Sequence, residues 1–329
     1  MRFAFSIFLL AGLVFLSGCV QEEKIYQSEP TQPGYIQTYG STDNESYNLT
    51  NKTPRWGKLS LNIFIDEGES KFTKGFNLKL VELFKEASKM LSNSIGDKLT
   101  FNFVIDREDA DIEVSWVETL PAKSLDAIGH TEFKFNVGLS YNVITKAKIK
   151  LLTSKNEILF KDNQVILVSL HELGHALGLD HSKNKQSIMY TEIQEGVKGP
   201  SQEDIQNIIE LYEKENLPNL LISEASAVKK VIRKGLSTAY LADVNFSVVN
   251  DGLVESGLFY FSIQAGDAKI QDNTTSLFPG GVFKIRYTNI HSQKDFSTII
   301  LSADPENRIK ELDEENEKTI IIQNVTETA

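Results

Sequence analysis

Hydrophobic and polar residues alternate in three early stretches of the chain, at 59–66, 99–105 and 110–117. A period of two is typical of strands that bury one face. Between the first two stretches, residues 76–91 repeat their hydrophobic positions with helical spacing, which predicts an amphipathic helix. The resulting strand, helix, strand order predicts a parallel pair of strands joined by a right-handed crossover.

Two more strands and two more helices are expected before residue 215. Residues 128–133 and 147–152 have strand character, and the first of them is expected at an edge of the sheet. The run 165–170 is hydrophobic on nearly every side, which indicates a helix buried in a core. Ser201 is a good N-cap residue with Asp204 three positions later, a capping-box pattern that predicts the start of the second helix.

Beyond Pro218 the pattern changes to short strand-like runs separated by turn residues. Pro218 ends the preceding helical region, because proline cannot continue a helix. The strand-like runs are 244–249, 258–263, 282–287, 297–301 and 318–322. Such spacing predicts a β-sandwich of about a hundred residues within 220–329.

Residues 1–19 resemble a targeting segment. The basic Arg2 precedes a hydrophobic run that is short for a bilayer span, and the segment ends in Leu16-Ser17-Gly18-Cys19. This ending is similar to a lipobox, which implies export, cleavage before Cys19 and a lipid anchor to the membrane on that cysteine. The alternative is an ordinary signal peptide in which the cysteine is accidental. Residues 20–53 are polar and rich in Pro, Ser, Thr and Gln, which predicts a flexible tether.

Composition narrows the choice of partners. The chain has 34 basic and 45 acidic residues, and its net charge of −11 argues against nucleic acid and anionic lipid surfaces. Cys19 is the single cysteine, so internal disulfides are excluded. The length suits two folded domains, which we place at 54–215 and 220–329.

The most informative motif is H-E-x-x-H-x-x-G-x-x-H at residues 171–181. Its spacing places His171 and His175 on one face of a helix, one turn apart. Glu172 is one step round the helix, where it can reach a metal-bound water without binding the metal. Gly178 can adopt a positive φ, so the chain can leave the helix sharply and return His181 as a third ligand. Three histidines leave the fourth position of a tetrahedral zinc open to water, as in catalytic sites.

This motif resembles that of the metzincin metallopeptidases. The following Ser187-Ile188-Met189-Tyr190 is similar to their Met-turn, in which Met189 would lie beneath the zinc. Tyr190 after the methionine is similar to the matrixin branch, in which a proline usually comes next, whereas this chain has Thr191. The resemblance implies an α+β domain with a twisted mixed sheet plus three helices, followed here by the all-β sandwich.

The resemblance also implies an activity. We expect a zinc-dependent endopeptidase with one catalytic Zn²⁺, which hydrolyses peptide bonds of proteins outside the cytoplasm. Glu172 would act as the base on the zinc-bound water, and an extended substrate would pair with the strand at 128–133. The ligands would be His171, His175 and His181. The alternative is a non-catalytic surface-binding lipoprotein that keeps a zinc-stabilised matrixin scaffold.

The second domain resembles the CARDB-type, immunoglobulin-like domains of prokaryotic surface proteins, through its phrases at 249–252 and 304–316. It could bind a surface partner, bind substrate or hold the peptidase away from the membrane. The acidic run 304–316 is either a Ca²⁺ site or, in preference, a solvated turn. In the first domain, His130 lacks the His/Asp/Gly-rich loop that carries a second zinc and calcium in vertebrate-type matrixins, so we expect no structural zinc.

Overall fold

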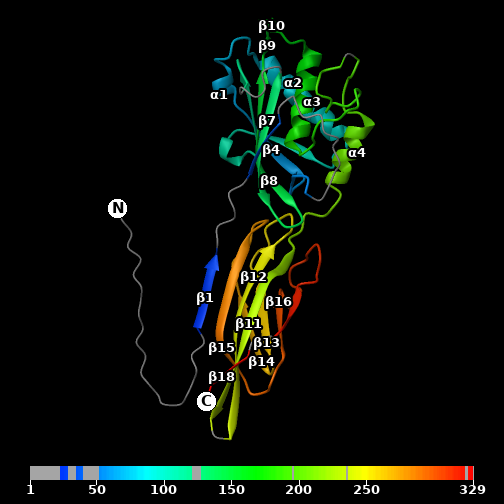
Figure 1. Ribbon diagram of the computed structural model, residues 1–329. Coiled ribbons are helices and arrows are strands. Elements are labelled where there is room, and N and C mark those ends of the chain that lie inside the picture. Colours follow the sequence, from blue (N-terminus) through cyan, green and yellow to red (C-terminus); the bar gives the residue numbers. More distant parts are fainter. Residues whose placement is uncertain are drawn as a thin grey trace, which may run out of the picture.

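The computed structural model describes residues 23–28, 35–39, 52–120, 127–194, 196–234, 236–322 and 325–328. Two units lie end to end, an N-terminal domain (described residues of 52–213) at the top of Figure 1 and a C-terminal domain (described residues of 217–322) below it. Each has its own hydrophobic core. The segment predicted as a signal peptide, including Cys19, lies outside the described residues. Among the described helices, none has the length and hydrophobicity that a membrane crossing needs.

The seven-stranded sheet of the N-terminal domain is built on four parallel strands and one antiparallel strand. In spatial order these are β5 (Thr100–Val104), β4 (Ser60–Ile65), β6 (Ile112–Val117), β8 (Asn142–Leu152) and β7 (Gly129–Val137). Strands β4 and β5 are parallel, which confirms the pairing predicted for the strand, helix, strand unit. Strand β7 runs antiparallel to β8, and the short β3 (Arg55–Trp56) adds a parallel contact to β8.

Three main helices accompany this sheet, as expected. They are α2 (Leu78–Ser94), α3 (Asp162–Ala176) and α4 (Gln202–Leu211), in addition to a short α1 (Glu67–Ser70) and a 3-10 turn η1 (Arg107–Asp109). The buried face of α2 includes Leu80, Phe84 and Leu91, which belong to the core that α3 also joins. A small hairpin of β9 (Ser154–Lys155) and β10 (Ile158–Leu159) precedes α3 and was not expected from the sequence.

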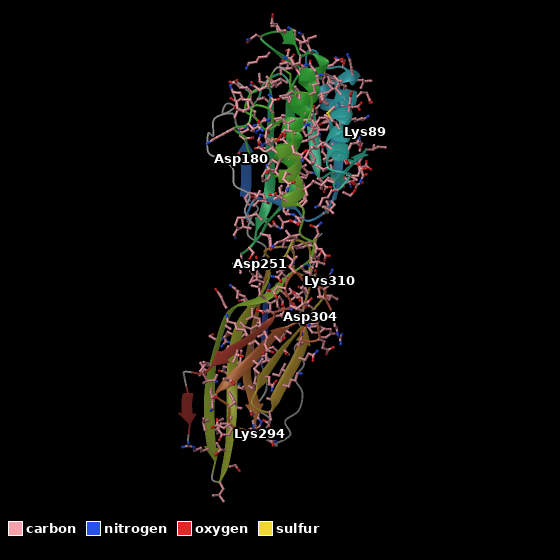
Figure 2. All side chains as sticks on the ribbon, turned by 90° about the vertical axis from the view of Figure 1, so that its right-hand side faces the viewer. Lys89, Asp180, Asp251, Lys294, Asp304 and Lys310 are labelled. Atoms are coloured by element: carbon pink, nitrogen blue, oxygen red, sulfur yellow. The ribbon has the colours of Figure 1, made fainter. Side chains whose placement is uncertain are left out.

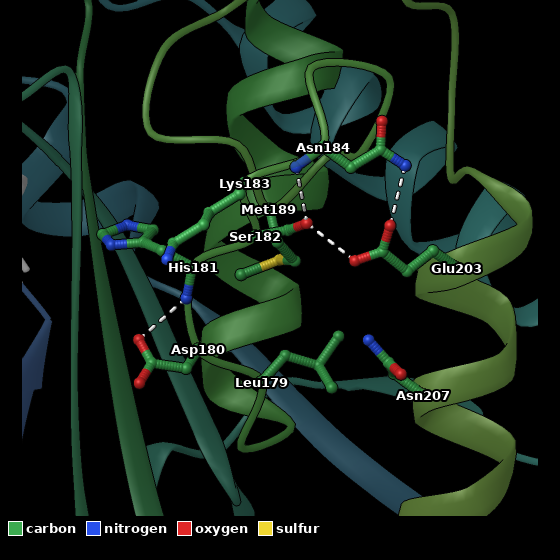
Figure 3. A pocket seen from close by; sticks show the side chains of 9 residues that line it. All are labelled: Leu179, Asp180, His181, Ser182, Lys183, Asn184, Met189, Glu203 and Asn207. Carbon is green, nitrogen blue, oxygen red and sulfur yellow. Dashed lines mark hydrogen bonds between the residues drawn. The ribbon is translucent and has the colours of Figure 1, made fainter. Parts of the chain in front are cut away.

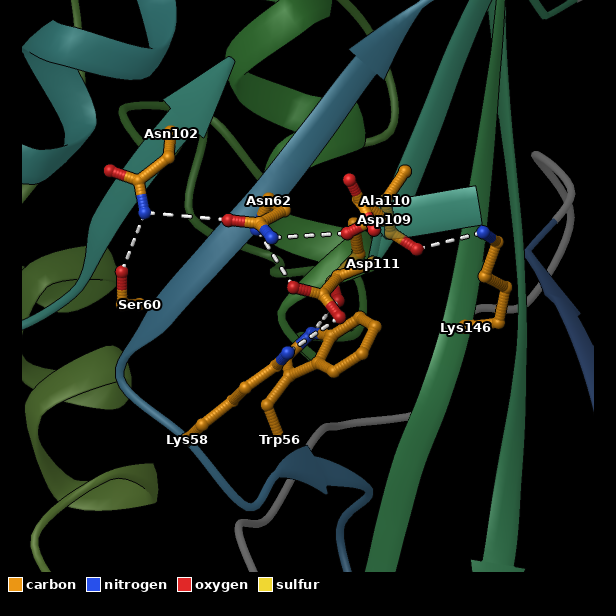
Figure 4. A network of polar contacts seen from close by, with 10 residues as sticks. Trp56, Lys58, Ser60, Asn62, Asn102, Asp109, Ala110, Asp111 and Lys146 are labelled. Carbon is orange, nitrogen blue, oxygen red and sulfur yellow. Dashed lines mark hydrogen bonds and ion pairs between the residues drawn. The ribbon is translucent and has the colours of Figure 1, made fainter. Parts of the chain in front are cut away.

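Asp111 connects neighbouring strands at the start of β6 (Figure 4). Its carboxylate accepts a hydrogen bond from the backbone N–H of Asn62 on β4 at 2.7 Å and forms an ion pair with Lys58 at 2.7 Å. On the other side of β6, the ammonium group of Lys146 on β8 donates to the carbonyl of Ala110 at 2.7 Å. Because β4 and β8 flank β6, these contacts fix the alignment of the central strands.

The C-terminal domain is a sandwich of two mainly antiparallel sheets, which confirms the predicted all-β architecture. The first sheet has the order β1-β15-β12-β11-β18, in which β1 is Glu23–Ser28, and the second has the order β14-β13-β16-β17. The strands after residue 217 are β11 (Leu220–Lys234), β12 (Ser237–Asn250), β13 (Tyr260–Ala265), β14 (Ala268–Asn273), β15 (Val282–Ser292), β16 (Thr298–Ala303), β17 (Glu317–Ile321) and β18 (Val325–Thr328).

Three of these strands, β11, β14 and β18, have no counterpart among the strand-like runs predicted from the sequence. All five strand-like runs overlap a strand of the sandwich, but β11 contains many small and charged residues and has little hydrophobic alternation. It is held instead by long antiparallel pairing with β12, from Leu220↔Asn250 to Lys234↔Ser237. The long strand β12 supplies backbone hydrogen bonds to β11, and the hydrophobic pattern of β11 alone does not reveal them.

Two strands lie in the stretch predicted as a tether. β1 (Glu23–Ser28) pairs antiparallel with β15 of the C-terminal domain, and β2 (Tyr35–Tyr39) pairs antiparallel with β7 of the N-terminal domain. Both strands therefore extend sheets whose other members lie far away in the sequence. The polar composition of 20–53 did not indicate them, because their partners are distant.

The two domains meet where the turn between β7 and β8 reaches a loop of the sandwich. The backbone N–H of Ser140 donates to a carboxylate oxygen of Asp251 at 2.7 Å, and the N–H of Asp251 donates to the carbonyl of Asn219 at 2.7 Å. Asp251 is buried, and Figure 2 shows it at the junction. An exposed ion pair between Lys310 and Glu215 lies at the same junction and contributes little, because water screens it.

Replacing Asp251 should weaken the N-terminal domain, although the residue belongs to the other domain. In Asp251→Ala the N–H of Ser140 loses its buried acceptor, a loss of about 1–3 kcal/mol. Both tryptophans, Trp56 and Trp116, lie in the N-terminal domain, so their fluorescence reports its unfolding in urea. We expect a lower midpoint for Asp251→Ala and a smaller change for Asp251→Asn, which keeps an acceptor oxygen. An unchanged midpoint in Asp251→Ala would show that the junction does not stabilise the N-terminal domain.

Candidate active site

Helix α3 carries the first two motif histidines and ends in a Schellman motif directly after them. The N–H of Leu179 donates to the carbonyl of Gly174 at 3.0 Å, and the N–H of Gly178 donates to the carbonyl of His175 at 2.9 Å. Gly178 has a φ of +99°, and a Cβ at this position would collide with the carbonyl oxygen of Pro54. The positive φ predicted for Gly178 is confirmed.

Two buried side chains satisfy carbonyl groups that this helix end leaves without helical partners. The indole N–H of Trp56 donates to the carbonyl of Ala176 at 2.8 Å, and the hydroxyl of Tyr212 donates to the carbonyl of Leu177 at 2.8 Å. Trp56 belongs to β3, and Tyr212 is the C-cap residue directly after α4. Residues near both ends of the domain therefore stabilise the end of α3, where the chain reverses toward His181.

The structure brings together the three histidines that the sequence analysis proposed as metal ligands. One ligand atom from each of His171, His175 and His181 lies within 4.8 Å of the other two. Among the described residues, no other group of three or more His, Cys, Asp or Glu side chains is placed closely enough to share a metal ion. His175 and His181 are buried, and His171 is partly buried.

Hydrogen bonds orient the two helical imidazoles toward a common point. Nδ1 of His171 lies 2.7 Å from the carbonyl oxygen of Ile188, and Nδ1 of His175 lies 2.8 Å from the carbonyl oxygen of Leu179. Since a carbonyl only accepts, each Nδ1 carries the proton and each Nε2 presents a lone pair. The two Nε2 atoms are 3.0 Å apart, so two lone pairs face each other. A divalent cation removes this repulsion, and the donor set therefore fits zinc.

Burial keeps these rings neutral, as metal binding requires. Burial, and to a lesser extent the neighbouring His181, lowers the pKa of His171 to about 4, against a smaller opposing effect of the Ile188 carbonyl. Burial and the other two motif histidines likewise hold the pKa of His175 well below its ordinary value. At neutral pH neither ring has to release a proton before it binds a cation.

Met189 packs against α3, the helix that carries His171 and His175. It is buried, and its sulfur is so close to Gly174 that a Cβ on that glycine would collide with it. Gly174, one of the unspecified positions of the motif, therefore leaves room for the methionine. The backbone N–H of Ser182 donates to the carbonyl of Met189 at 2.9 Å, which ties this turn to the residue after His181.

Asp204 fastens the same turn to the start of α4. Its carboxylate accepts hydrogen bonds from the hydroxyl of Ser187, the N–H of Ile188 at 3.0 Å and the N–H of Ser201 at 2.7 Å. The last contact closes the capping box that the sequence predicted, because the hydroxyl of Ser201 also accepts from the N–H of Asp204 at 3.2 Å. Asp204 is buried, so one carboxylate connects a helix start to the carbonyl that orients His171.

Glu172 faces strand β7. The hydroxyl of Thr131 donates to its carboxylate at 2.6 Å, and a Cβ on Gly129 would collide with that carboxylate. Burial raises the pKa of Glu172 to about 8, and the hydrogen bond from Thr131 opposes this rise. A carboxyl group with a proton affinity near neutrality can both accept a proton and release it, as a general base and acid must.

A cleft of about 720 Å³ opens over these groups. Its walls combine hydrophobic residues, such as Phe160, Leu167 and Val197, with polar ones, such as Gln164 and Glu192. Thr191, which stands where matrixins usually have proline, lines this cleft beside Tyr190. A smaller pocket of about 300 Å³ lies behind His181 and is shown in Figure 3, where Glu203 accepts hydrogen bonds from Ser182 and Asn184 at 2.7 Å each.

Two residues of this site, Thr131 and Gly129, were not expected from the sequence. Both lie in the strand predicted at 128–133, but no role was predicted for either residue. Their contact with Glu172 spans about forty residues of sequence, and only the closeness of β7 to α3 creates it. Cys19, the proposed lipidation site, lies outside the described residues. His130 is buried in β7, next to the site.

Removing the Asp204 carboxylate should loosen the turn that carries Ile188 and Met189. Asp204→Ala leaves several buried donors without an acceptor, so we expect a loss of about 3 kcal/mol in the free energy of unfolding. We also expect zinc binding about tenfold weaker, because the carbonyl that orients His171 is released. Urea unfolding and chelator competition measure these quantities. Gln202→Ala, in the same helical turn but exposed, is the control, and equal effects in both variants would contradict this role.

Comparison with known families agrees with this geometry. Residues 55–213 match the family model of matrixin, and residues 217–320 match the family model of CARDB. No curated protein matches the chain significantly.

Two solved structures are similar to the C-terminal part. One is the CARDB domain of a Pyrococcus furiosus protein in complex with di-metal ions, at 19% identity over 33% of this chain and 90% of that chain, with a TM-score of 0.25. The other is a domain of a Methanosarcina acetivorans protein described as belonging to the cell surface, at 18% identity over 33% of this chain and 92% of that chain, with a TM-score of 0.26. The family matches support both resemblances seen in the sequence: residues 55–213 are a matrixin-family domain, and residues 217–320 are a CARDB domain.

Proposed function

We propose that this protein is a zinc-dependent endopeptidase in which His171, His175 and His181 hold the metal and Glu172 is the general base. The observation that carries the proposal is the convergence of the three imidazoles beside a buried carboxyl group, at a cleft large enough for a side chain of a peptide. The matrixin family supports the same chemistry. The three histidines leave room for a non-protein ligand, which a purely structural zinc site does not need.

The roles divide between the metal and the side chains. When bound, zinc supplies a Lewis acid that polarises the scissile carbonyl and makes a water easier to deprotonate. Glu172 accepts a proton from the attacking water and later donates it to the leaving amine. Thr131 keeps the carboxylate of Glu172 against β7, and Met189 forms the apolar floor beneath the imidazoles.

The substrate we propose is an extended peptide segment of a protein. An extended peptide can add to the outer edge of β7 by main-chain hydrogen bonds while one side chain enters the cleft. The hydrophobic residues of the cleft, such as Phe160 and Leu167, suit an apolar side chain there. We also propose that the protein acts outside the cytoplasm with a lipid anchor on Cys19, which rests on the sequence of residues 1–19 alone. The CARDB domain would then contact a surface partner or the substrate.

Glu172→Ala should abolish turnover and keep the metal. Loss of a general base lowers the rate by about 10²–10⁴-fold, whereas the three imidazoles are untouched. Residues 20–329 would be assayed against a mixed peptide library by mass spectrometry, with zinc content measured in parallel. His175→Ala is the control, and it should lose both zinc and activity. A wild-type chain that binds one zinc and cleaves nothing would instead support a non-catalytic binding protein.

Thr131→Val should lower kcat and leave KM and zinc content unchanged. The two side chains have nearly the same shape, so the substitution removes the hydrogen bond to Glu172 and little else. We expect kcat to fall about tenfold, because a poorly placed base costs rate and not binding. Thr131→Ser, which restores the hydroxyl, should recover most of the rate. Equal kcat in Thr131→Val and wild type would show that the hydroxyl does not position the base.

A further inference from the structure

The outer edge of β7 is covered by a segment of the same chain. Strand β2 pairs antiparallel with β7, from Tyr35↔Phe135 to Tyr39↔Thr131. On its other side β7 pairs with β8, so β2 takes the last position in the sheet. The backbone groups of β7 that would otherwise accept another strand are thus engaged by residues 35–39.

This covered edge reaches the candidate active site at its Thr131 end, next to the cleft-lining Gly129. The Tyr39 end of β2 lies opposite Thr131, whose side chain donates to the carboxylate of Glu172. Thr131 and Phe133 are fully buried, so their side chains point into the domain while the backbone edge faces outward. One strand therefore supports the base with its side chains and binds β2 with its main chain.

We propose that residues 35–39 occupy the peptide-binding edge of the active site and compete with substrate for it. This inference rests on the proposed function, since it assumes that the substrate is an extended peptide which adds to β7. A strand has only one free edge here, so β2 and a substrate strand cannot pair with the same residues of β7 at once. The strand that occupies this edge of β7 is therefore a segment of the same chain.

The sequence of this segment suits the role. Tyr35, Ile36, Thr38 and Tyr39 are aromatic or β-branched and favour strands, and none of the five residues is charged. They stand in a stretch that is otherwise rich in polar residues, proline and glycine. A five-residue strand is weak by itself, so a peptide substrate can displace it.

The chain on either side keeps the segment close to its site. Before it, β1 pairs with β15 of the C-terminal domain, and after it, β3 pairs with β8 of the N-terminal domain. A segment held at both ends acts at a high effective concentration, in the millimolar range for short linkers. Even weak pairing of residues 35–39 is then enough to cover the edge of β7 in most molecules.

Competition predicts a change in KM without a change in kcat. If the segment fills the edge in about nine molecules of ten, its removal lowers KM about tenfold, because only the open form binds substrate. We would replace residues 35–39 by a Gly-Ser sequence of equal length within residues 20–329, and replace residues 43–47 in the same way as a control. A lower KM in the first variant alone supports the inference. An unchanged KM in the first variant overturns it.

Single prolines test the strand pairing itself. In an antiparallel strand successive N–H groups point to opposite sides, so only one of Ile36→Pro and Gln37→Pro removes a hydrogen bond to β7. We expect one member of this pair to lower KM and the other to leave it near the wild-type value. Equal KM values in both variants and the wild type contradict the pairing.

A measurement without turnover separates this inference from the proposed function. In a Glu172→Ala background, hydrogen exchange of the β7 amides is compared between the wild-type segment and the Gly-Ser replacement. Faster exchange at residues 131–135 in the replacement shows that the segment covers the edge, even if no variant cleaves a peptide. That combination of results would rule out the proposed endopeptidase activity and still support the pairing of residues 35–39 with β7. Unchanged exchange at these amides overturns the inference whatever the activity.

Discussion

The end of helix α3 is the constraint on which the rest of the site depends. His171 and His175 need a helix, whereas His181 can join them only if that helix stops at once and the chain reverses. Gly178 allows the reversal, with its positive φ and its close approach to Pro54. The carbonyl of Leu179 within this same turn orients His175. The helix end therefore acts as part of the candidate metal site as well as its scaffold.

A second set of contacts makes the site depend on distant parts of the domain. Asp204 at the start of α4 holds the turn whose Ile188 carbonyl orients His171, and Tyr212 at the end of α4 holds the end of α3. One helix thus fixes both sides of the histidine cluster. Geometry of this kind keeps the imidazoles in place before any metal arrives, so that binding needs little rearrangement.

Strand β7 combines support for the base with recognition of a strand. Its buried residues place Glu172, and its exposed edge pairs with β2. The single cysteine, Cys19, is the predicted site of the lipid anchor, so the proposed endopeptidase would need some other means than a cysteine bound to the zinc to limit its activity. A segment that competes for the strand edge offers one that is reversible and depends on substrate concentration. The CARDB domain contributes to this arrangement, because β15 holds β1 upstream of the segment.

The sequence by itself determined the local features: the parallel strand, helix, strand unit, the capping box at Ser201, the positive φ at Gly178 and the spacing of the three histidines. Each of these depends on residues close together in the chain, where periodicity and backbone preference act directly. Only the tertiary structure decided that Thr131 contacts Glu172, that Asp251 joins the two domains and that β2 covers β7. These contacts join segments that are distant in the sequence and carry no local pattern, so they arise only when the sheets assemble.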